Sequence, residues 1–264
     1  MVTLTRSPPA LLTLENLTLQ SNAGYTALHS AAGHGNLGQI PPSVLLAADF
    51  GQKTHLGQTV FHETAEHGAL DRLPAGLVSL ERLLEKNLSG ETVFHVAALN
   101  GHLDQLPPEV ITEEAMMQVT NAGDTPIHSA AISGHLHQIP AGLLNARTLV
   151  VASNTGFTPM HAAAETGQLN KIPARALTLD LLLARNDNGD TPLHAAAFEG
   201  HLDQVPATLL TAETIETRNY EGLTVSRIAV DRKFSHQIPE AIRPKPPGAF
   251  KRFMSKPGDT RAPF

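Results

Sequence analysis

The sequence predicts an all-α protein, a repeat solenoid of about seven 33-residue helix-turn-helix units with a divided outer helix. Three observations support this fold class. A Thr recurs at intervals of 33 residues, a Gly stands two residues before each of these threonines, and a Pro recurs with the same period in the second half of each unit. The threonines are Thr26, Thr59, Thr92, Thr125, Thr158, Thr191 and Thr224.

Each unit is expected to begin with a tight turn that leads into a short helix. The Gly before the Thr, such as Gly123, suits a turn that requires a positive φ angle. The Thr is a favourable N-cap, and Pro126, Pro159 and Pro192 follow it at the first helical position. Pairs of Ala within the helix allow neighbouring helices to approach closely. A second Gly, such as Gly134, is expected to end the helix.

The second half of each unit is expected to form two short helices instead of one. In the full units an Ile, Leu or Val is followed by Pro, which disrupts a helix interior but starts a new helix readily. These prolines are Pro41, Pro74, Pro107, Pro140, Pro173, Pro206 and Pro239, and Pro8 precedes them at the same spacing. In the sixth unit the pattern predicts helical pieces around Leu202 to Leu210 and Thr211 to Thr217.

The period also divides the chain into three segments. Residues 1–20 match the second half of a unit and are expected to form an N-terminal half repeat, with Leu4 and Pro8 in phase with later units. Residues 21–242 form the predicted array, and residues 243–264 a basic, Pro-rich, flexible tail. The tail carries six basic residues and one acidic residue, a net charge of +5, which leaves −11 for residues 1–242. Because an acidic body repels phosphate backbones, no nucleic acid partner is expected.

The repeated motif resembles that of the ankyrin repeat family. T-P-L-H-A-A-A-F-E-G-H-L at Thr191 to Leu202 and T-P-I-H-S-A-A-I-S-G-H-L at Thr125 to Leu136 carry the likeness, which extends over seven units. The second half departs from the family, because Pro stands in place of a longer Leu-rich helix. The resemblance implies a non-catalytic scaffold that binds another protein or a peptide. It also implies a structural role for the His three residues after each Thr, through hydrogen bonds to the Thr and the nearby backbone.

By the same resemblance, a partner is expected at the turn tips and the ends of the first helices, along the concave side. These positions differ between units, whereas the scaffold positions repeat. The predicted partner-binding residues are Tyr25, Glu91, Leu99, Asp124, Ile132, Phe157, Glu165, Asp190, Phe198 and Glu199. An apolar stripe bordered by acidic side chains suits a basic amphipathic segment. Alternatively, the apolar residues simply pack against their neighbours.

The sequence predicts no catalytic residue, cofactor or metal site. It contains no Cys, nucleophile elbow, phosphate-binding loop or H-E-x-x-H helix. Eleven of its 14 His fall on three repeat positions. The His residues that follow the Thr by three lie one helix spacing apart, roughly 8–10 Å, which is too far to share a metal. A weak metal-dependent enzyme that uses His135 and His137 stays as an alternative.

A second alternative is a peripheral membrane or assembly factor that acts through the tail. Ala249 to Lys256 interleaves Phe and Met with Lys and Arg, a pattern suited to an acidic groove or a membrane surface, although a solvated extension has the same composition. Folding of this tail onto the acidic body, in competition with a partner, is a further hypothesis. No secretion signal or apolar run of about 20 residues is visible, which favours a soluble, cytoplasmic protein.

Overall fold

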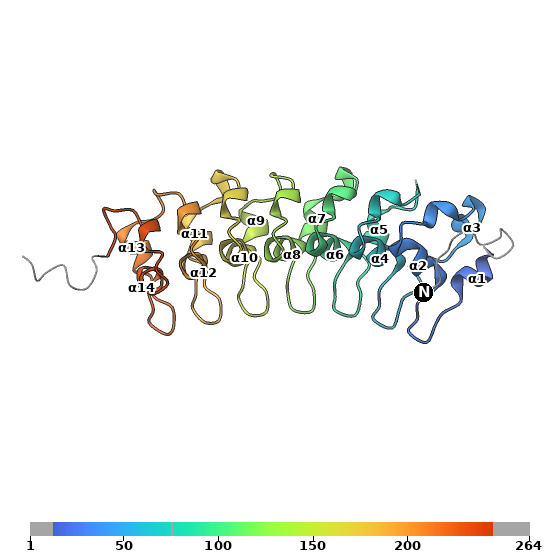
Figure 1. The fold of residues 1–264 in the computed structure, drawn as a ribbon, viewed down its shortest axis with the longest axis horizontal. Helices are drawn as coiled ribbons and strands as arrows, with labels where there is room; N and C mark the ends of the chain where they lie inside the picture. Colours follow the sequence, from blue (N-terminus) through green and yellow to red (C-terminus); the bar gives the residue numbers. More distant parts are fainter. Residues whose placement is uncertain (1–12, 75, 245–264) are drawn as a thin grey trace, which may run out of the picture.

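The computed structural model describes residues 13–74 and 76–244, which form an elongated row of helical units (Figure 1). In this part of the chain the secondary structure is helical, without strands, apart from an isolated bridge between Arg218 and Thr224. The prediction of an all-α repeat solenoid is therefore confirmed. We number the units 1 to 7 by their threonines, from Thr26 to Thr224. The row is gently bowed, and the turn tips lie on the inner side of the bend (Figure 1).

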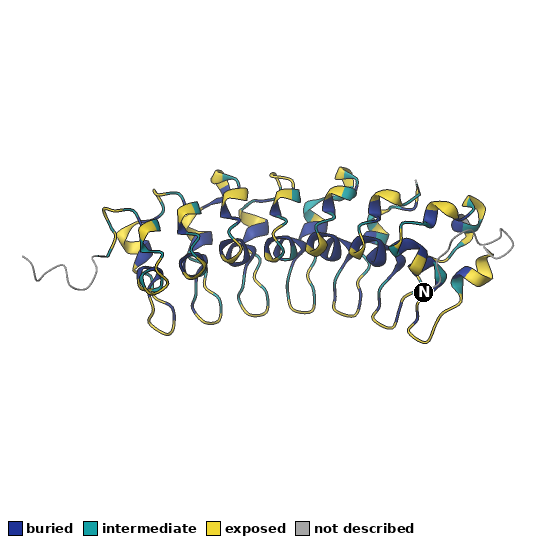
Figure 2. Ribbon diagram, in the orientation of Figure 1, coloured by how far each residue is buried: buried dark blue, intermediate teal, exposed yellow. Residues whose placement is uncertain are grey.

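A row of short inner helices forms the core of the protein. These are α2 (Ala27–Gly33), α4 (Val60–Glu66), α6 (Val93–Asn100), α8 (Pro126–Ile132), α10 (Pro159–Glu165), α12 (Pro192–Glu199) and α14 (Val225–Asp231). Each packs against the next, and together they form a continuous buried band (Figure 2). Large side chains such as Phe61, Phe94 and Met160 are fully buried, as are the Ala pairs that let the helices approach closely.

The predicted role of the first His in each unit is confirmed in units 1 to 6. The Thr hydroxyl lies 2.8 or 2.9 Å from the His Nδ1, and the ring closes a capping box at the start of the helix. The His Nε2 lies 3.0–3.3 Å from a backbone carbonyl of the next unit. Because a carbonyl only accepts, Nε2 carries the proton and Nδ1 accepts from the Thr. We call this series His29, His62, His95, His128, His161 and His194 the histidine ladder.

Burial keeps the ladder neutral. Desolvation lowers the pKa of all six ladder histidines, and it lowers the pKa of His62 and of His95 to about 4. The bond to the next unit opposes this shift in every case but is the smaller effect. The neutral tautomer that the hydrogen bonds require is thus also the one that burial favours.

A second set of links joins the opposite ends of the inner helices. The Nδ1 atoms of His102, His135 and His201 donate to carbonyls near the end of the preceding inner helix, at 2.7, 3.3 and 2.9 Å. In unit 5, Gln168 makes the equivalent bond at 2.6 Å. The Gly before His102 is required twice over: Gly101 has a φ of 75°, and a Cβ there would lie 2.7 Å from His135 Nε2 of the next unit.

Next in each unit comes a single 3₁₀ turn, which begins the outer row. These turns are η2 (Leu37–Gln39), η3 (Leu70–Arg72), η4 (Leu103–Gln105), η6 (Leu136–Gln138), η7 (Leu169–Lys171), η9 (Leu202–Gln204) and η10 (Ser235–Gln237). The short outer helices are α1 (Leu14–Thr18), α3 (Pro42–Ala47), α5 (Leu80–Leu83), α7 (Glu113–Met116), α9 (Ala146–Leu149), α11 (Leu179–Leu182) and α13 (Ala212–Ile215). The outer helix is therefore divided, as predicted.

The first outer helical piece is shorter than predicted. In most units the Pro is followed by a single turn and not by a helix. In unit 6 the piece expected over Leu202 to Leu210 is only η9. After Pro206 the chain makes one turn, in which the Leu209 N–H donates to the Pro206 carbonyl at 2.8 Å. Three units go further, with α3, η5 (Pro108–Val110) and η8 (Ala174–Ala176). One turn is enough because a second cap then begins the outer helix.

That second cap is a column of Ser, Thr or Asn five residues after the Pro, which was not predicted. Its members are Thr13, Ser79, Thr112, Asn145, Thr178 and Thr211, and each accepts a hydrogen bond from a backbone N–H of the first turn. Unit 1 has Leu46 at this position, and its outer helix α3 starts earlier, directly after Pro41. The capping column therefore sets where the outer helices begin.

The predicted end segments are described only in part. Of the half repeat expected over residues 1–20, the structure describes α1, in register with the outer helices of later units, whereas Leu4 and Pro8 lie outside the described residues. Of the tail expected over residues 243–264, only Arg243 and Pro244 are described, so the basic segment Ala249 to Lys256 also lies outside. None of the described helices has the length and apolar character needed to cross a membrane.

Lys233 allows a test of the expectation that a residue with positive φ at the end of the inner helix should be Gly. It replaces the Gly of the other units and has a φ of 69°, which is costly for a residue with a Cβ. We expect Lys233→Gly to increase the free energy of unfolding by about 1 kcal/mol, measured by urea denaturation. The control Lys233→Ala keeps the Cβ and should give no such gain. Equal stabilisation by both substitutions would contradict the backbone explanation.

The histidine ladder predicts loss of stability in acid. Between the unfolded pKa of about 6.5 and the lowered folded pKa, the unfolded chain binds protons that the folded chain excludes, so stability falls as pH falls. Each such histidine contributes a slope of about 1.4 kcal/mol per pH unit. Glu63 and Glu165, whose pKa is raised, act in the opposite direction, but they are fewer than the ladder histidines. We expect the urea midpoint to fall between pH 7 and pH 5.

A substitution in the ladder separates this effect from general acid sensitivity. His95→Gln keeps a side chain that can complete the capping box but removes the titrating ring. This variant should be less stable at pH 7, because the bond to the Asp124 carbonyl is lost, and its stability should depend less steeply on pH. His55→Gln, at an exposed turn tip, is the control for loss of an imidazole. An unchanged pH slope in His95→Gln would contradict the prediction.

Candidate functional site

The turn tips are held rigidly by bonds between successive units. In most tips, a polar side chain five residues before the Thr accepts the N–H of the residue just before the Thr; Asn87, for example, accepts from Glu91 at 2.9 Å. The tips also bond to one another: the Leu88 N–H donates to the Leu56 carbonyl at 3.0 Å. Side chains at the tips and on the adjacent helix ends therefore project from a fixed backbone.

A first groove lies between units 3 and 4, and it contains four of the ten predicted residues. Glu91 and Asp124 come from the tips, and Leu99 and Ile132 from the ends of α6 and α8. Leu99 and Ile132 are 44% and 50% exposed, so they are not tucked into the core. The Glu91 carboxylate accepts a hydrogen bond from Asn87 Nδ2 at 2.8 Å, which fixes its position at the rim.

A second groove lies over units 5 to 7, and it contains four more of the predicted residues. Glu165 ends α10, Asp190 lies at the tip of unit 6, and Phe198 and Glu199 end α12. Asp190 accepts a hydrogen bond from Asn219 Nδ2 at 2.7 Å. Phe198 is 46% exposed.

Arg232 holds the Phe198 ring in place. Its guanidinium carbon lies 3.3 Å from the centre of the ring, in a cation–π contact from unit 7. Arg232 does not line the second groove, whereas Phe198 and Ile228 do. The ring is therefore fixed as an apolar wall of the groove.

The carboxylates around both grooves have no basic partner among the described residues. The ion pairs in that part of the chain are Lys53–Glu85, Arg147–Glu113 and Arg227–Asp231, and none of them includes a groove residue. Burial, and then the charge of Glu199, raise the pKa of Glu165. The charge of Glu199 is the smaller of the two causes, and a cation bound beside both carboxylates would oppose the rise in pKa.

The remaining two predicted residues, Phe157 and Tyr25, lie outside the grooves. Phe157 is half-buried, and its ring stacks on His161 with 5.2 Å between centroids. Tyr25 is 39% exposed, and its hydroxyl donates to Glu63 Oε1 at 2.6 Å. Burial, and then Glu63, raise the pKa of Tyr25, so the phenol stays protonated and donates.

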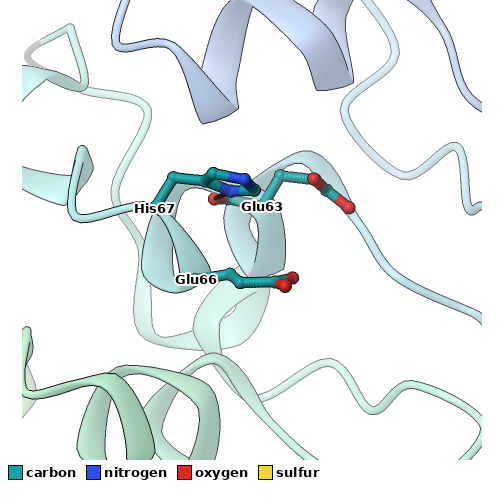
Figure 3. Close-up of side chains that lie close together, drawn as sticks. All are labelled: Glu63, Glu66 and His67. Carbon is teal, nitrogen blue, oxygen red and sulfur yellow. Dashed lines mark hydrogen bonds between the residues drawn. The ribbon is translucent and has the colours of Figure 1, made fainter.

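Glu63 belongs to a group of three potential metal ligands on α4. Glu63, Glu66 and His67 project from this helix, and their ligand atoms lie within 4.8 Å of one another (Figure 3). Glu63 is only 3% exposed, while Glu66 and His67 are exposed. Side chains of the protein already hydrogen-bond to Glu63. Its carboxylate accepts from the Tyr25 hydroxyl, and its backbone carbonyl accepts from His67 Nδ1 at 3.0 Å.

The alternative metal pair, His135 and His137, has a different geometry. The two rings meet edge to face with 6.1 Å between centroids. His135 Nδ1 contacts the Ala98 carbonyl and the Ser133 hydroxyl, so this ring is one of the links between units. Among the described residues, the only group of three His, Asp or Glu side chains with ligand spacing is the one on α4.

Several residues on this face were not predicted, although the sequence contains a signal for them. Glu63 and Ile228 stand four residues after the Thr, and Glu66 stands seven after it. Positions three apart share one face of a helix. Leu99 and Ile132 stand at the variable position seven residues after the Thr. The position four residues after the Thr should therefore belong to the same surface. Arg232 acts through Phe198, a contact that no spacing rule indicates.

The fold and this surface define a class of protein: a helical repeat solenoid with a fixed scaffold and a variable concave side. The ankyrin repeat family model matches residues 188–214, so unit 6 is similar to an ankyrin repeat. The other units repeat its turn, cap and inner helix, which confirms the resemblance. An ankyrin repeat is a module for protein–protein interaction, and proteins built from it are generally non-catalytic. A search of curated proteins found no match.

The Glu63 carboxylate allows a test of whether buried negative charge on this face destabilises the folded protein at pH 7. Burial raises its pKa, so stability from the protonated form is lost as pH rises through the folded pKa. Glu63→Gln removes the charge and keeps an acceptor for Tyr25, so we expect a higher thermal midpoint at pH 7 and a smaller difference from wild type near pH 4. Tyr25→Phe, which leaves the carboxylate without its donor, should instead cost about 1–2 kcal/mol at pH 7. A less stable Glu63→Gln at pH 7 would contradict the assignment.

Proposed function

We propose that the protein is a non-catalytic module that binds a basic segment of another protein along the concave side. One observation carries the proposal: two grooves with exposed apolar side chains are each bordered by carboxylates that have no Lys or Arg partner among the described residues. A Lys or Arg side chain supplies the missing charge at its head and apolar contact along its stem. Charge complementarity of this kind favours both the rate and the specificity of binding.

The scaffold supports this function because binding requires little reorganisation. The tips are joined by backbone hydrogen bonds, and the inner helices are joined at both ends by His or Gln links. A preorganised surface loses little conformational freedom when a partner binds. Exposed Leu99, Ile132 and Phe198 then contribute apolar contact in the grooves, while the carboxylates form the rim.

Capture from a cell lysate with matched variants tests the proposed function. Ile132→Glu/Phe198→Glu changes one apolar residue in each groove, and Val150→Glu/Leu179→Glu makes the same change at exposed positions of the outer row. We expect wild type and the outer-row control to retain a common set of proteins. The groove variant should lose these proteins, and raised salt should release them from wild type.

Two checks keep this result interpretable. Circular dichroism and thermal midpoints should be alike for all three proteins, because every substituted residue is exposed. Retention of the same partners by the folded groove variant would overturn the proposed site. Binding that salt does not weaken would overturn the expectation of a basic partner.

A further inference from the structure

The two grooves present the same chemistry twice along one face. Each combines exposed apolar side chains with at least two carboxylates that lack a basic partner in the described chain. In the first groove the carboxylates are Glu91 and Asp124, and in the second they include Glu165 and Glu199. A ligand that satisfies one groove therefore has the chemistry to satisfy the other.

The packing of the inner helices sets the distance between the grooves. The first groove lies between α6 and α8, and the Phe198 wall of the second lies on α12. These helices follow one another in a single row, with α10 between α8 and α12 (Figure 1). Packed helices are about 8–10 Å apart, so two and a half spacings give a separation of roughly 20–25 Å.

This separation matches a short extended chain. An extended segment advances about 3.3 Å per residue and covers the distance in about six to eight residues. A helix, at about 1.5 Å per residue, would need roughly 13–17 residues. A helix is also about 10–12 Å wide, wider than one spacing of the inner helices, so single side chains enter the grooves more readily than a helix does.

We propose that one extended segment of a partner protein occupies both grooves, with two anchors about seven residues apart. Each anchor is a Lys or Arg next to a large apolar residue. The apolar side chain contacts Leu99 and Ile132 in the first groove and Phe198 in the second, and the cation pairs with the adjacent carboxylates. This inference rests on the proposed function and specifies its ligand.

Binding through two linked anchors has a measurable consequence. Once one anchor is bound, the second binds intramolecularly, and affinity increases provided that the linker has the right length. A stiff linker makes this dependence sharp. Polyproline spacers advance about 3.1 Å per residue, so spacers of 3, 7 and 14 residues separate the anchors by about 9, 22 and 43 Å.

The experiment measures fluorescence polarisation of labelled peptides that carry two Leu-Arg anchors joined by these spacers. Peptides with a single Leu-Arg anchor give the reference affinity. With the full chain we expect the 7-residue spacer to bind at least tenfold more tightly than either other spacer and than the single anchor, at a stoichiometry of one to one.

Groove variants assign the two anchors. Glu91→Gln/Asp124→Asn in the first groove, or Glu165→Gln/Glu199→Gln in the second, should each reduce the affinity of the 7-residue peptide to that of the single anchor. Glu109→Gln/Glu114→Gln changes two exposed carboxylates of the outer row and should leave it unchanged. Loss of affinity with this control as great as with the groove variants would overturn the assignment.

The outcomes separate this inference from the proposed function. If the single anchor binds and no spacer length improves on it, the two-anchor ligand is wrong while binding of a basic segment stands. Tightest binding with the 3-residue or 14-residue spacer also overturns the two-anchor geometry. If no Leu-Arg peptide binds at any spacing, both the inference and the basic ligand of the proposed function fail.

Discussion

The hydrogen bond from a buried histidine to a carbonyl of the next unit is the interaction on which the rest of the structure depends. In His95 the same ring accepts from Thr92, which caps its own helix, and donates to the Asp124 carbonyl at the next tip. One side chain therefore begins a helix and positions the following turn. Repetition of this link in six units fixes the inner helices and the tips in one register. Lowered pKa values show that the ladder is built for the neutral imidazole.

Because the ladder and the Ala pairs hold the inner row, the outer row can be interrupted without loss of order. Pro limits the chain to about one turn, and a new cap such as Thr112 then begins the next short helix. The outer helices are too short to be stable by themselves, so they depend on burial of residues such as Leu83 and Met116 against the inner row. The surface proposed to bind a partner lies on the turn tips and inner helices, which the histidine ladder holds together.

Much of the fold could be predicted from the sequence because each scaffold position has one local physical cause. Thr caps, Gly adopts positive φ, and Ala permits close packing, so a 33-residue period was sufficient to place the inner helices. The predicted length of the first outer piece was wrong, because Val205, which directly precedes Pro206, is extended and ends the helical turn at Gln204. The second cap was missed because Thr shares that position with Ser79, Asn145 and, in unit 1, Leu46, so no single residue type marks the column.

The candidate site was less predictable, because it depends on contacts between units. Eight of the ten predicted residues lie in two grooves, yet nothing in the spacing indicated that Arg232 of unit 7 would hold Phe198 of unit 6. Hydrogen bonds at the turn tips explain why the carboxylates keep their charge. Amide donors from Asn87 and Asn219 hold Glu91 and Asp190 in place without neutralising them, unlike the Lys and Arg partners found elsewhere. Carboxylates held by neutral donors keep their charge available to a ligand, which is why we assign the basic partner to this face.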